Sequence, residues 1–167
     1  MTDAELLTAV CGVVQTITGA ARVIEAYPAA APPSLPYIEV NFLGSAPVRA
    51  NQIEDEFAEV DGIETQTPVV DTEWRFSVHA FGQGSSDLLR RLVSGARLLQ
   101  PQEAIEPLII HEVSEVRSVP EYVNNAWQPR AQADLFIRGL TRDGFVIIPI
   151  DEASFTINGR ASGPISP

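Results

Sequence analysis

Two segments of this chain repeat their apolar residues at helical spacing, and this pattern limits the fold most strongly. The first runs from about Asp3 to Thr18. Thr2 lies just before it and Glu5 lies in its first turn, and these two residues have the spacing of a capping box. The second begins after the turn residues 82–87 and is expected to end at Pro101. Both segments are amphipathic, so each needs another element against which to bury its apolar face.

Much of the remaining chain alternates apolar and polar residues, as half-buried strands do. The segments with this period are residues 37–43, 69–81, 107–117 and 125–140. Asp143 and Gly144 form a strong two-residue turn signal, which predicts a hairpin between the strand before it and residues 145–150.

The segments between these elements carry different signals. Residues 28–36 contain four prolines and should form a stiff, extended connector. Residues 44–68 are rich in Glu and Asp, and they predict either a long β-hairpin or a mobile loop with a solvated acidic face. Residues 118–125 are expected to form a loop. From Asn158 on, Gly, Ser and Pro predict a tail that is loose or docks on a neighbour.

The order of these elements predicts an α+β fold. We expect a mixed or antiparallel β-sheet with two main helices packed on one face, together with β-hairpin extensions. The length of 167 residues fits one domain. Residues 1–140 should form its body, and residues 141–167 should form a C-terminal hairpin and loose tail that extend the same domain.

The charge of the chain excludes some classes of function. There are 22 acidic residues against 11 basic ones, which gives a net charge of −11, and every basic residue is Arg. Proteins that hold nucleic acid show the opposite balance, because basic groups neutralise the phosphates. No apolar run approaches the roughly 20 residues of a membrane helix, and the N-terminus is acidic where a secretory signal would be basic. We therefore expect a protein used in the cytoplasm or carried out within a particle.

No motif in the sequence predicts catalysis. Cys11 stands alone in an apolar stretch and is expected to be a small buried hydrophobe. His79 and His111 lie on predicted strands without the spacing of metal ligands. A phosphate-binding loop needs a Lys, which the chain lacks, and there is no Gly-x-Ser-x-Gly elbow. We expect no catalytic residue, no cofactor, no metal site and no enzyme activity.

Two stretches of the sequence resemble the phage neck or tail terminator family. The first joins the strand Trp74–Gly82 to the helix after Ser85, and the second runs from Tyr122 to Ile137. The Tyr-x-x-Val strand after Pro36 also fits this family. The family's tryptophan, short gap and Arg-Ala strand correspond to Trp127, Arg130, Ala131 and Asp134. The resemblance covers about residues 3–140.

The resemblance implies a small subunit that assembles as a ring, usually a hexamer, on the last ring of tail-tube protein. Such a ring stops tube growth, offers a docking surface to the head connector and, in contractile tails, contacts the sheath. DNA would pass through its lumen without specific binding, which suits a net-negative ring. The protein would then belong to the tail or neck of the virion and be assembled in the bacterial cytoplasm.

A ring of identical subunits needs two different, complementary patches on each subunit. Arg is suited to pairing with carboxylates at such patches, so the arginines could meet the acidic 54–61 region of the next subunit. The candidate interface residues are Arg90, Arg91, Arg97, Trp127, Arg130, Glu54, Asp55 and Glu56. For the helix arginines, a plain solvated face is the preferred interpretation. Trp127 could be a core residue and Arg130 a paired surface group.

Two other interpretations stay open. Another neck, minor tail or baseplate protein would share these features. A small-ligand or carbohydrate-binding β-rich module belongs to a different class, and in it Trp74, Tyr122 and Trp127 would form an aromatic platform. A binding module should be a monomer with an exposed aromatic cleft, whereas a terminator should self-associate.

Overall fold

The computed structural model describes residues 2–27, 31–147, 153–157 and 160–165. The chain divides into two compact units, one made of Met1–Ala50 and Asp71–Leu140 and the other of Asn51–Val70 and Thr141–Pro167. Residues 51–70 therefore group with the C-terminal extension rather than with the body. We predicted that the body and the extension form a single domain, and this stays a prediction.

The first predicted helix is confirmed as α1 (Asp3–Thr18). Its capping box is formed: the Glu5 amide donates to Thr2 Oγ1 at 3.3 Å, and the Thr2 amide donates to Glu5 Oε2 at 2.7 Å. Gly19 ends the helix with a φ of +67°, in the left-handed region that glycine adopts without strain. The helix buries one stripe of residues, Leu6, Val10, Val13, Val14 and Thr18.

The second predicted helix is shorter than expected. It forms α2 (Ser85–Gly95), and Pro101 does not end it but lies inside a separate short helix, α3 (Leu99–Gln102). Pro101 is tolerated there because it falls in the first turn, where its missing amide has no helical partner to lose. A 3₁₀ turn, η1 (Glu103–Ile105), follows. Leu98 separates α2 from α3, because its backbone is extended rather than helical.

The main sheet is mixed, as predicted. Its central path, in spatial order, is β1 (Val23–Glu25), β2 (Tyr37–Pro47), β4 (Ile63–Phe81), β9 (Arg130–Arg142) and β5 (Ile109–Val113). β1 pairs parallel with β2, while β2 with β4 and β5 with β9 are antiparallel. The strand predicted over 107–117 is divided between β5 and β6 (Arg117–Ser118), because the Ser114 side chain interrupts the ladder by accepting the Asp134 amide.

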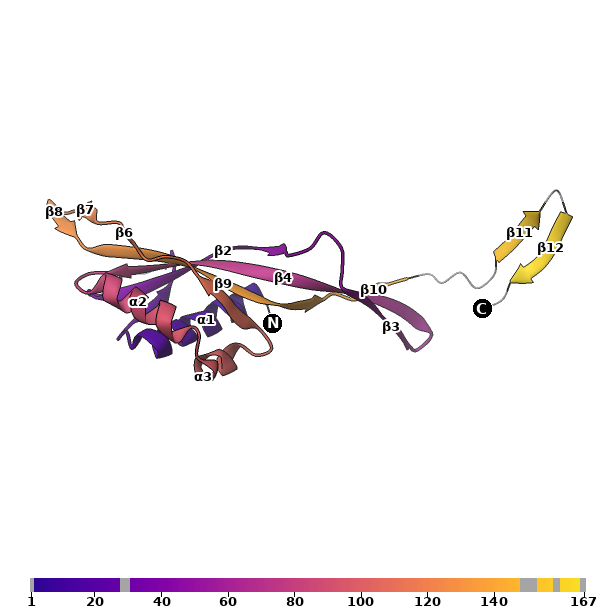
Figure 1. The fold of residues 1–167 in the computed structure, drawn as a ribbon, viewed down its shortest axis with the longest axis horizontal. Coiled ribbons are helices and arrows are strands. Elements are labelled where there is room, and N and C mark those ends of the chain that lie inside the picture. The colour runs from indigo at the N-terminus through magenta and orange to yellow at the C-terminus, as the bar shows by residue number, and fades with distance from the viewer. Residues whose placement is uncertain (1, 28–30, 148–152, 158–159, 166–167) are drawn as a thin grey trace. The chain divides into compact units, whose positions relative to one another are not determined.

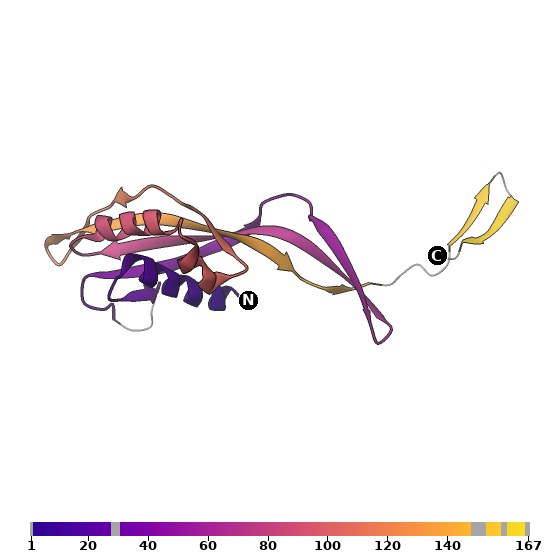
Figure 2. The same ribbon diagram turned by 60° about the horizontal axis from the view of Figure 1, so that its bottom comes forward.

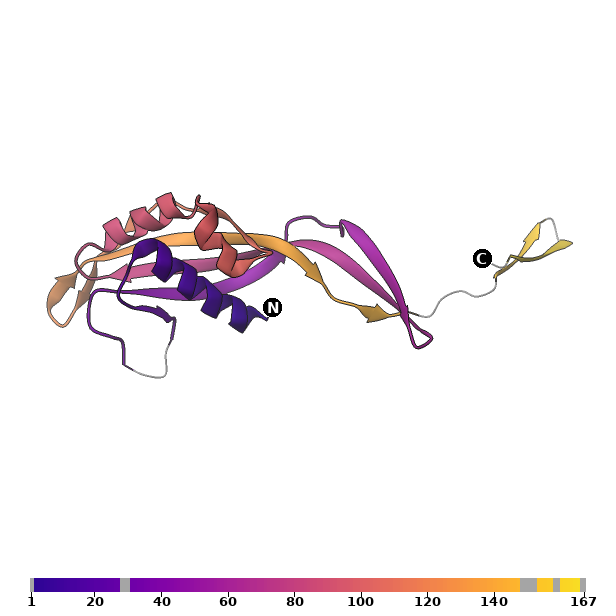
Figure 3. The same ribbon diagram turned by 90° about the horizontal axis from the view of Figure 1, so that it is seen from below.

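The core of the first unit lies between the sheet and the two main helices. Figures 1 and 3 show the helices on one face of the sheet, and Figure 2 shows α1 beside α2. The apolar faces predicted for two strands are buried against them: Trp74, Phe76, Val78 and Ala80 of β4, and Ala131, Ala133, Leu135 and Ile137 of β9. The α+β fold predicted from the sequence is confirmed. Within the described residues, the opposite face of the sheet carries no helix.

The second unit contains a three-stranded ribbon. β3 (Glu54–Val60) pairs antiparallel with the start of β4 around a tight turn, in which Asp61 and Gly62 both have positive φ. Of the two forms predicted for residues 44–68, the hairpin is therefore the one that occurs. β10 (Phe145–Val146) pairs antiparallel with the other edge of β4, at Gln66 and Thr65.

The hairpin predicted at Asp143 and Gly144 is wrong. Asp143 and Gly144 do not turn the chain back on β9, because β10 pairs with β4. Neither residue has the positive φ that a tight hairpin turn requires. In the segment where a tail was predicted to be loose or to dock on a neighbour, β11 (Ala153–Ile157) pairs antiparallel with β12 (Arg160–Ile165), and docking of the tail stays a prediction. Residues 28–30, 148–150 and Asn158 lie outside the described residues.

Candidate interaction surfaces

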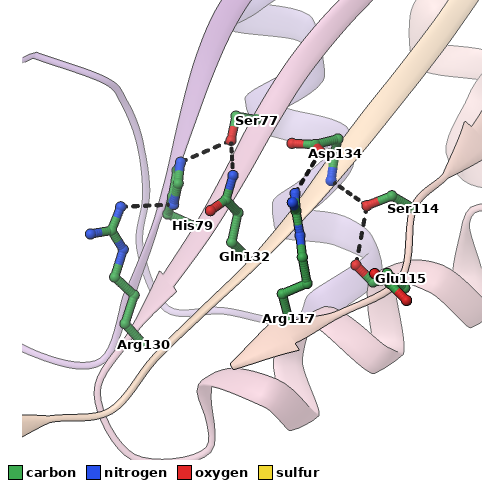
Figure 4. A network of polar contacts seen from close by, with 8 residues as sticks. All are labelled: Ser77, His79, Ser114, Glu115, Arg117, Arg130, Gln132 and Asp134. Atoms are coloured by element: carbon green, nitrogen blue, oxygen red, sulfur yellow. Dashed lines mark hydrogen bonds and ion pairs between the residues drawn. The ribbon is translucent and has the colours of Figure 1, made fainter. Parts of the chain in front are cut away.

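The helix-free face of the sheet carries a polar network (Figure 4). Its members alternate with the buried residues of β4 and β9, so they point away from the helices. Ser77 Oγ lies 2.8 Å from His79 Nε2, and His79 Nδ1 lies 3.0 Å from an Arg130 guanidinium nitrogen. The Gln132 amide donates to Ser77 Oγ at 3.2 Å.

The proton positions in this network follow from its donors. A guanidinium group can only donate, so His79 Nδ1 accepts from Arg130, and the ring proton is on Nε2, facing Ser77 Oγ. Burial, and then the charge of Arg130, lowers the pKa of His79, which agrees with a neutral ring. A serine nucleophile needs an unprotonated histidine nitrogen facing it. The Ser77–His79 pair, which lies within β4, has the opposite polarity, and Arg130 and Gln132 join it to β9.

Arg130 uses its charge within the chain. Besides His79, it reaches Glu121 Oε2 at 3.3 Å, and its guanidinium carbon lies 5.0 Å from the centre of the Phe81 ring. Its Nε is buried and has no hydrogen-bond partner among the described residues. Arg130 therefore links β9 to β4 and to the segment that carries Glu121.

A second cluster on the same face is also compensated. Arg117 and Asp134 form an ion pair of 2.6 Å, and the Asp134 amide donates to Ser114 Oγ at 2.8 Å (Figure 4). Farther along β9, Arg138 pairs with Glu73 at 3.0 Å, and Glu73 also pairs with Arg75 at 3.2 Å. These internal pairs leave few unbalanced charges on this face.

An aromatic hairpin replaces the loop that was predicted for residues 118–125. β7 (Glu121–Val123) pairs with β8 (Ala126–Gln128) around Asn124 and Asn125, which both have positive φ. The Tyr122 and Trp127 rings pack edge to face, 5.3 Å apart. Trp127 is 70% exposed, so the alternative of a core tryptophan is wrong. The Asn-Asn pair was the sequence signal for this turn, because Asn tolerates the left-handed conformation.

An apolar groove of about 380 Å³ lies beside this hairpin. Trp127 and Val123 line it on one side, and Leu35 and Pro36 line it on the other. Trp74 is buried in the core at 8% exposure, so the three-residue aromatic platform predicted for a binding module does not form. Only Tyr122 and Trp127 of that set are exposed.

The arginines of α2 border a different groove, of about 550 Å³. Arg90 pairs with Asp87 one turn earlier on the helix. In the part of the chain that the structure describes, Arg91 and Arg97 have no carboxylate within 4.0 Å. The charges of Arg91 on α2 and of Arg97 in the turn after it are therefore not compensated by an ion pair among the described residues.

The three predicted carboxylates lie on β3, in the second unit. Glu56 forms a 3.1 Å ion pair with Arg142. Asp55 accepts from the Gln52 amide at 3.1 Å through one oxygen, and the other oxygen has no hydrogen-bond partner among the described residues. Glu54 is exposed.

Comparison with known proteins decides the family. The family described as phage neck terminator protein matches residues 4–161. The chain belongs to the phage neck terminator family. The resemblance noted in the sequence is thereby confirmed. No curated protein matches this neck terminator.

A solved structure has a similar fold. It is the sheath/tube terminator of an extracellular contractile injection system, PVC, in its extended state. The two chains superpose with a TM-score of 0.51 at 11% identity, over 97% of the neck terminator and 65% of the other chain. At this identity the likeness concerns the fold alone. The neck terminator thus spans about two thirds of the length of that protein.

The neck terminator presents its predicted site residues in three groups: Arg90 and Arg91 on α2 with Arg97 in the turn after it, Trp127 and Arg130 at the aromatic hairpin, and Glu54, Asp55 and Glu56 on β3. Among its described residues, no three His, Cys, Asp or Glu side chains are gathered as a metal ion would require. None of the helices described is long and apolar enough to cross a membrane. The Ser77–His79 network was not predicted as a site.

Proposed function

We propose that this neck terminator closes the tube of a phage-type tail as a ring of identical subunits, hexameric by expectation. The ring stops tube growth and offers its other side to the head connector. The observation that carries this proposal is the family match over residues 4–161. The fold shared with a protein named as a sheath/tube terminator supports it.

The proposed partners follow from this position. They are further copies of the chain, the tail-tube protein, the head connector and, if the tail is contractile, the sheath. The family places the protein in the tail or neck of the virion, and we propose that assembly takes place in the host cytoplasm. The role is structural, and we propose no reaction for it.

The charges of Arg91 and Arg97, which form no ion pair among the described residues, support a head-to-tail interface. Ring interfaces are heterologous, so one patch of a subunit meets a different patch of the next. We propose that Arg90 and Arg91 of α2, and Arg97 in the turn after it, face the acidic strand of the next copy. The residues of that strand are Glu54, Asp55 and Glu56. Trp127, held in place by the hairpin that Arg130 anchors, adds an exposed aromatic contact to the subunit interface.

The net charge suits a conduit for DNA. A ring of subunits that each carry −11 repels phosphates on average, so DNA can pass without specific binding. A basic lumen would retain DNA in a salt-dependent manner.

Light scattering at several protein concentrations tests the proposal. We expect a hexamer, or an equilibrium between monomer and hexamer, and binding to the ends of assembled tail tubes. A protein that stays monomeric and also ignores tube ends would contradict the proposal and would favour a binding module.

A further inference from the structure

The ribbon of the second unit has one face that carries two phenylalanines. Phe57 of β3 and Phe145 of β10 both pair with Gln66 of the central strand β4. Directly paired residues point to the same face of a sheet, so the two rings flank Gln66 on one side. We call this side the Phe face. It also carries Asp55 and Glu59, which lie two residues before and after Phe57 on β3, and Glu64, which lies two residues before Gln66 on β4.

The Phe face is not covered by the described residues of its own unit. Phe57 is 68% exposed and Phe145 is 59% exposed. A ribbon of three strands usually needs an apolar face packed on another element to be stable. Large apolar side chains gathered on an exposed face commonly mark a contact with another molecule. The three carboxylates beside the rings favour a partner that presents positive charge.

The groove beside α2 has the complementary properties. Its floor is formed by Ile17 of α1, Gly95 of α2 and Leu98, which is 60% exposed. Gly95 allows α2 to pack closely on α1, because a side chain there would collide with Ile17. Asp87, Arg90 and Arg91 also line it, and because Asp87 pairs with Arg90, Arg91 supplies its unbalanced positive charge. The guanidinium of Arg91 lies beside Gly19 at the end of α1 and has no carboxylate within 4.0 Å among the described residues.

We propose that the Phe face of one copy docks into the α1–α2 groove of a second copy. Phe57 enters the apolar floor at Leu98, and Glu59 pairs with Arg91. The occupant is a second copy because the chain itself carries both an acidic, aromatic ribbon and a basic, apolar groove. A head-to-tail contact of this kind can close into a ring.

This inference rests on the proposed ring and makes it more specific. Glu54 and Glu56 lie on the opposite face of the ribbon, and Glu56 already pairs with Arg142. The carboxylates that meet α2 are then Asp55, Glu59 and Glu64 of the Phe face. Of the three carboxylates predicted from the sequence, only Asp55 belongs to this set.

The test uses the full chain and one variant on each side of the contact. Phe57→Ser removes the anchor, and Leu98→Glu places a charge on the groove floor. Each should weaken self-association at least about tenfold, as expected for a buried aromatic anchor. Val146→Ser is the matched control, because Val146 is 72% exposed on the opposite face of the same ribbon. It should assemble like the wild type, and circular dichroism should show that all three variants are folded.

Mixing the two variants tests the head-to-tail geometry. Phe57→Ser keeps a working groove and Leu98→Glu keeps a working ribbon, so together they should form a 1:1 heterodimer that grows no further. The charge pair gives an independent test: Glu59→Arg and Arg91→Glu should each weaken association, and the double variant should recover it.

Two outcomes separate this inference from the proposed function. If wild-type rings form and Phe57→Ser rings form equally well, or if Val146→Ser fails as Phe57→Ser does, the docking is overturned and the terminator function stands. If the wild type forms no ring in solution or on tube ends, both are overturned.

Discussion

The two tryptophans of the chain should differ sharply in what they contribute to stability. Trp74 lies in the core between the sheet and the helices and is 8% exposed, whereas Trp127 stands on the aromatic hairpin and is 70% exposed. Replacing each by Ala therefore compares a cavity in the core with a loss at the surface. The two substitutions remove the same atoms, so the position alone decides the result.

The structure sets the expected magnitudes. Trp74→Ala should lower the free energy of unfolding by about 3–5 kcal/mol, the usual cost of deleting a buried aromatic side chain. Trp127 loses mainly its contact with the Tyr122 ring, at 5.3 Å, so Trp127→Ala should cost about 1 kcal/mol or less. For a chain of this size, Tm changes by roughly 2–4 °C per kcal/mol. Trp74→Ala should therefore lower Tm by about 6–20 °C, and Trp127→Ala by less than about 4 °C.

Thermal unfolding followed by circular dichroism measures both shifts. Because each variant keeps one tryptophan, fluorescence should show a blue-shifted emission from Trp74 and a solvent-exposed emission from Trp127. Trp127→Ala should also weaken ring assembly while it leaves the fold intact. Equal losses of stability in the two variants would refute the reasoning, since they would place both side chains in similar surroundings.

Three further predictions concern single groups. Thr2→Ala removes the hydroxyl that caps α1 and should cost about 1 kcal/mol, measured by thermal unfolding, with an unchanged Tm as the contrary result. Burial raises the pKa of the Cys11 thiol to about 12, so alkylation at pH 8 should be slow until the chain unfolds, and fast labelling of the native protein would contradict this. The pKa of His79 is lowered in the folded chain, so the unfolded chain binds more protons and stability should fall as the pH drops from about 7 to 5.5. Glu39, which pairs with His79 in the sheet, has a raised pKa, so it makes stability rise as the pH falls further. In denaturant titrations, His79→Gln should flatten the dependence of stability on pH between 7 and 5.5.

Local signals in the sequence were enough for the elements that bury one regular face. The capping box and Gly19 located α1, and alternation located the long strands β4 and β9. The signals failed where several short elements follow one another. The stripe after Ser85 continues through Leu99, so sequence periodicity could not show that Leu98 separates two helices.

The interaction surfaces were harder to predict, because they depend on which strands become neighbours. His79 and Arg130 are 51 residues apart and meet only because β4 and β9 are adjacent. Likewise, Phe57 and Phe145 share a face only because β3 and β10 flank the same strand. The sequence predicted that arginines near residues 90–97 and an acidic segment meet at an interface, which stays a prediction, and it could not show which carboxylates share a face with Phe145.

The most direct test of the central claim is electron microscopy of assembled tail tubes incubated with the purified protein. The account predicts a ring at one end of each tube and no further growth when more tube protein is added. Tubes that carry no ring and keep lengthening at the same rate would contradict it.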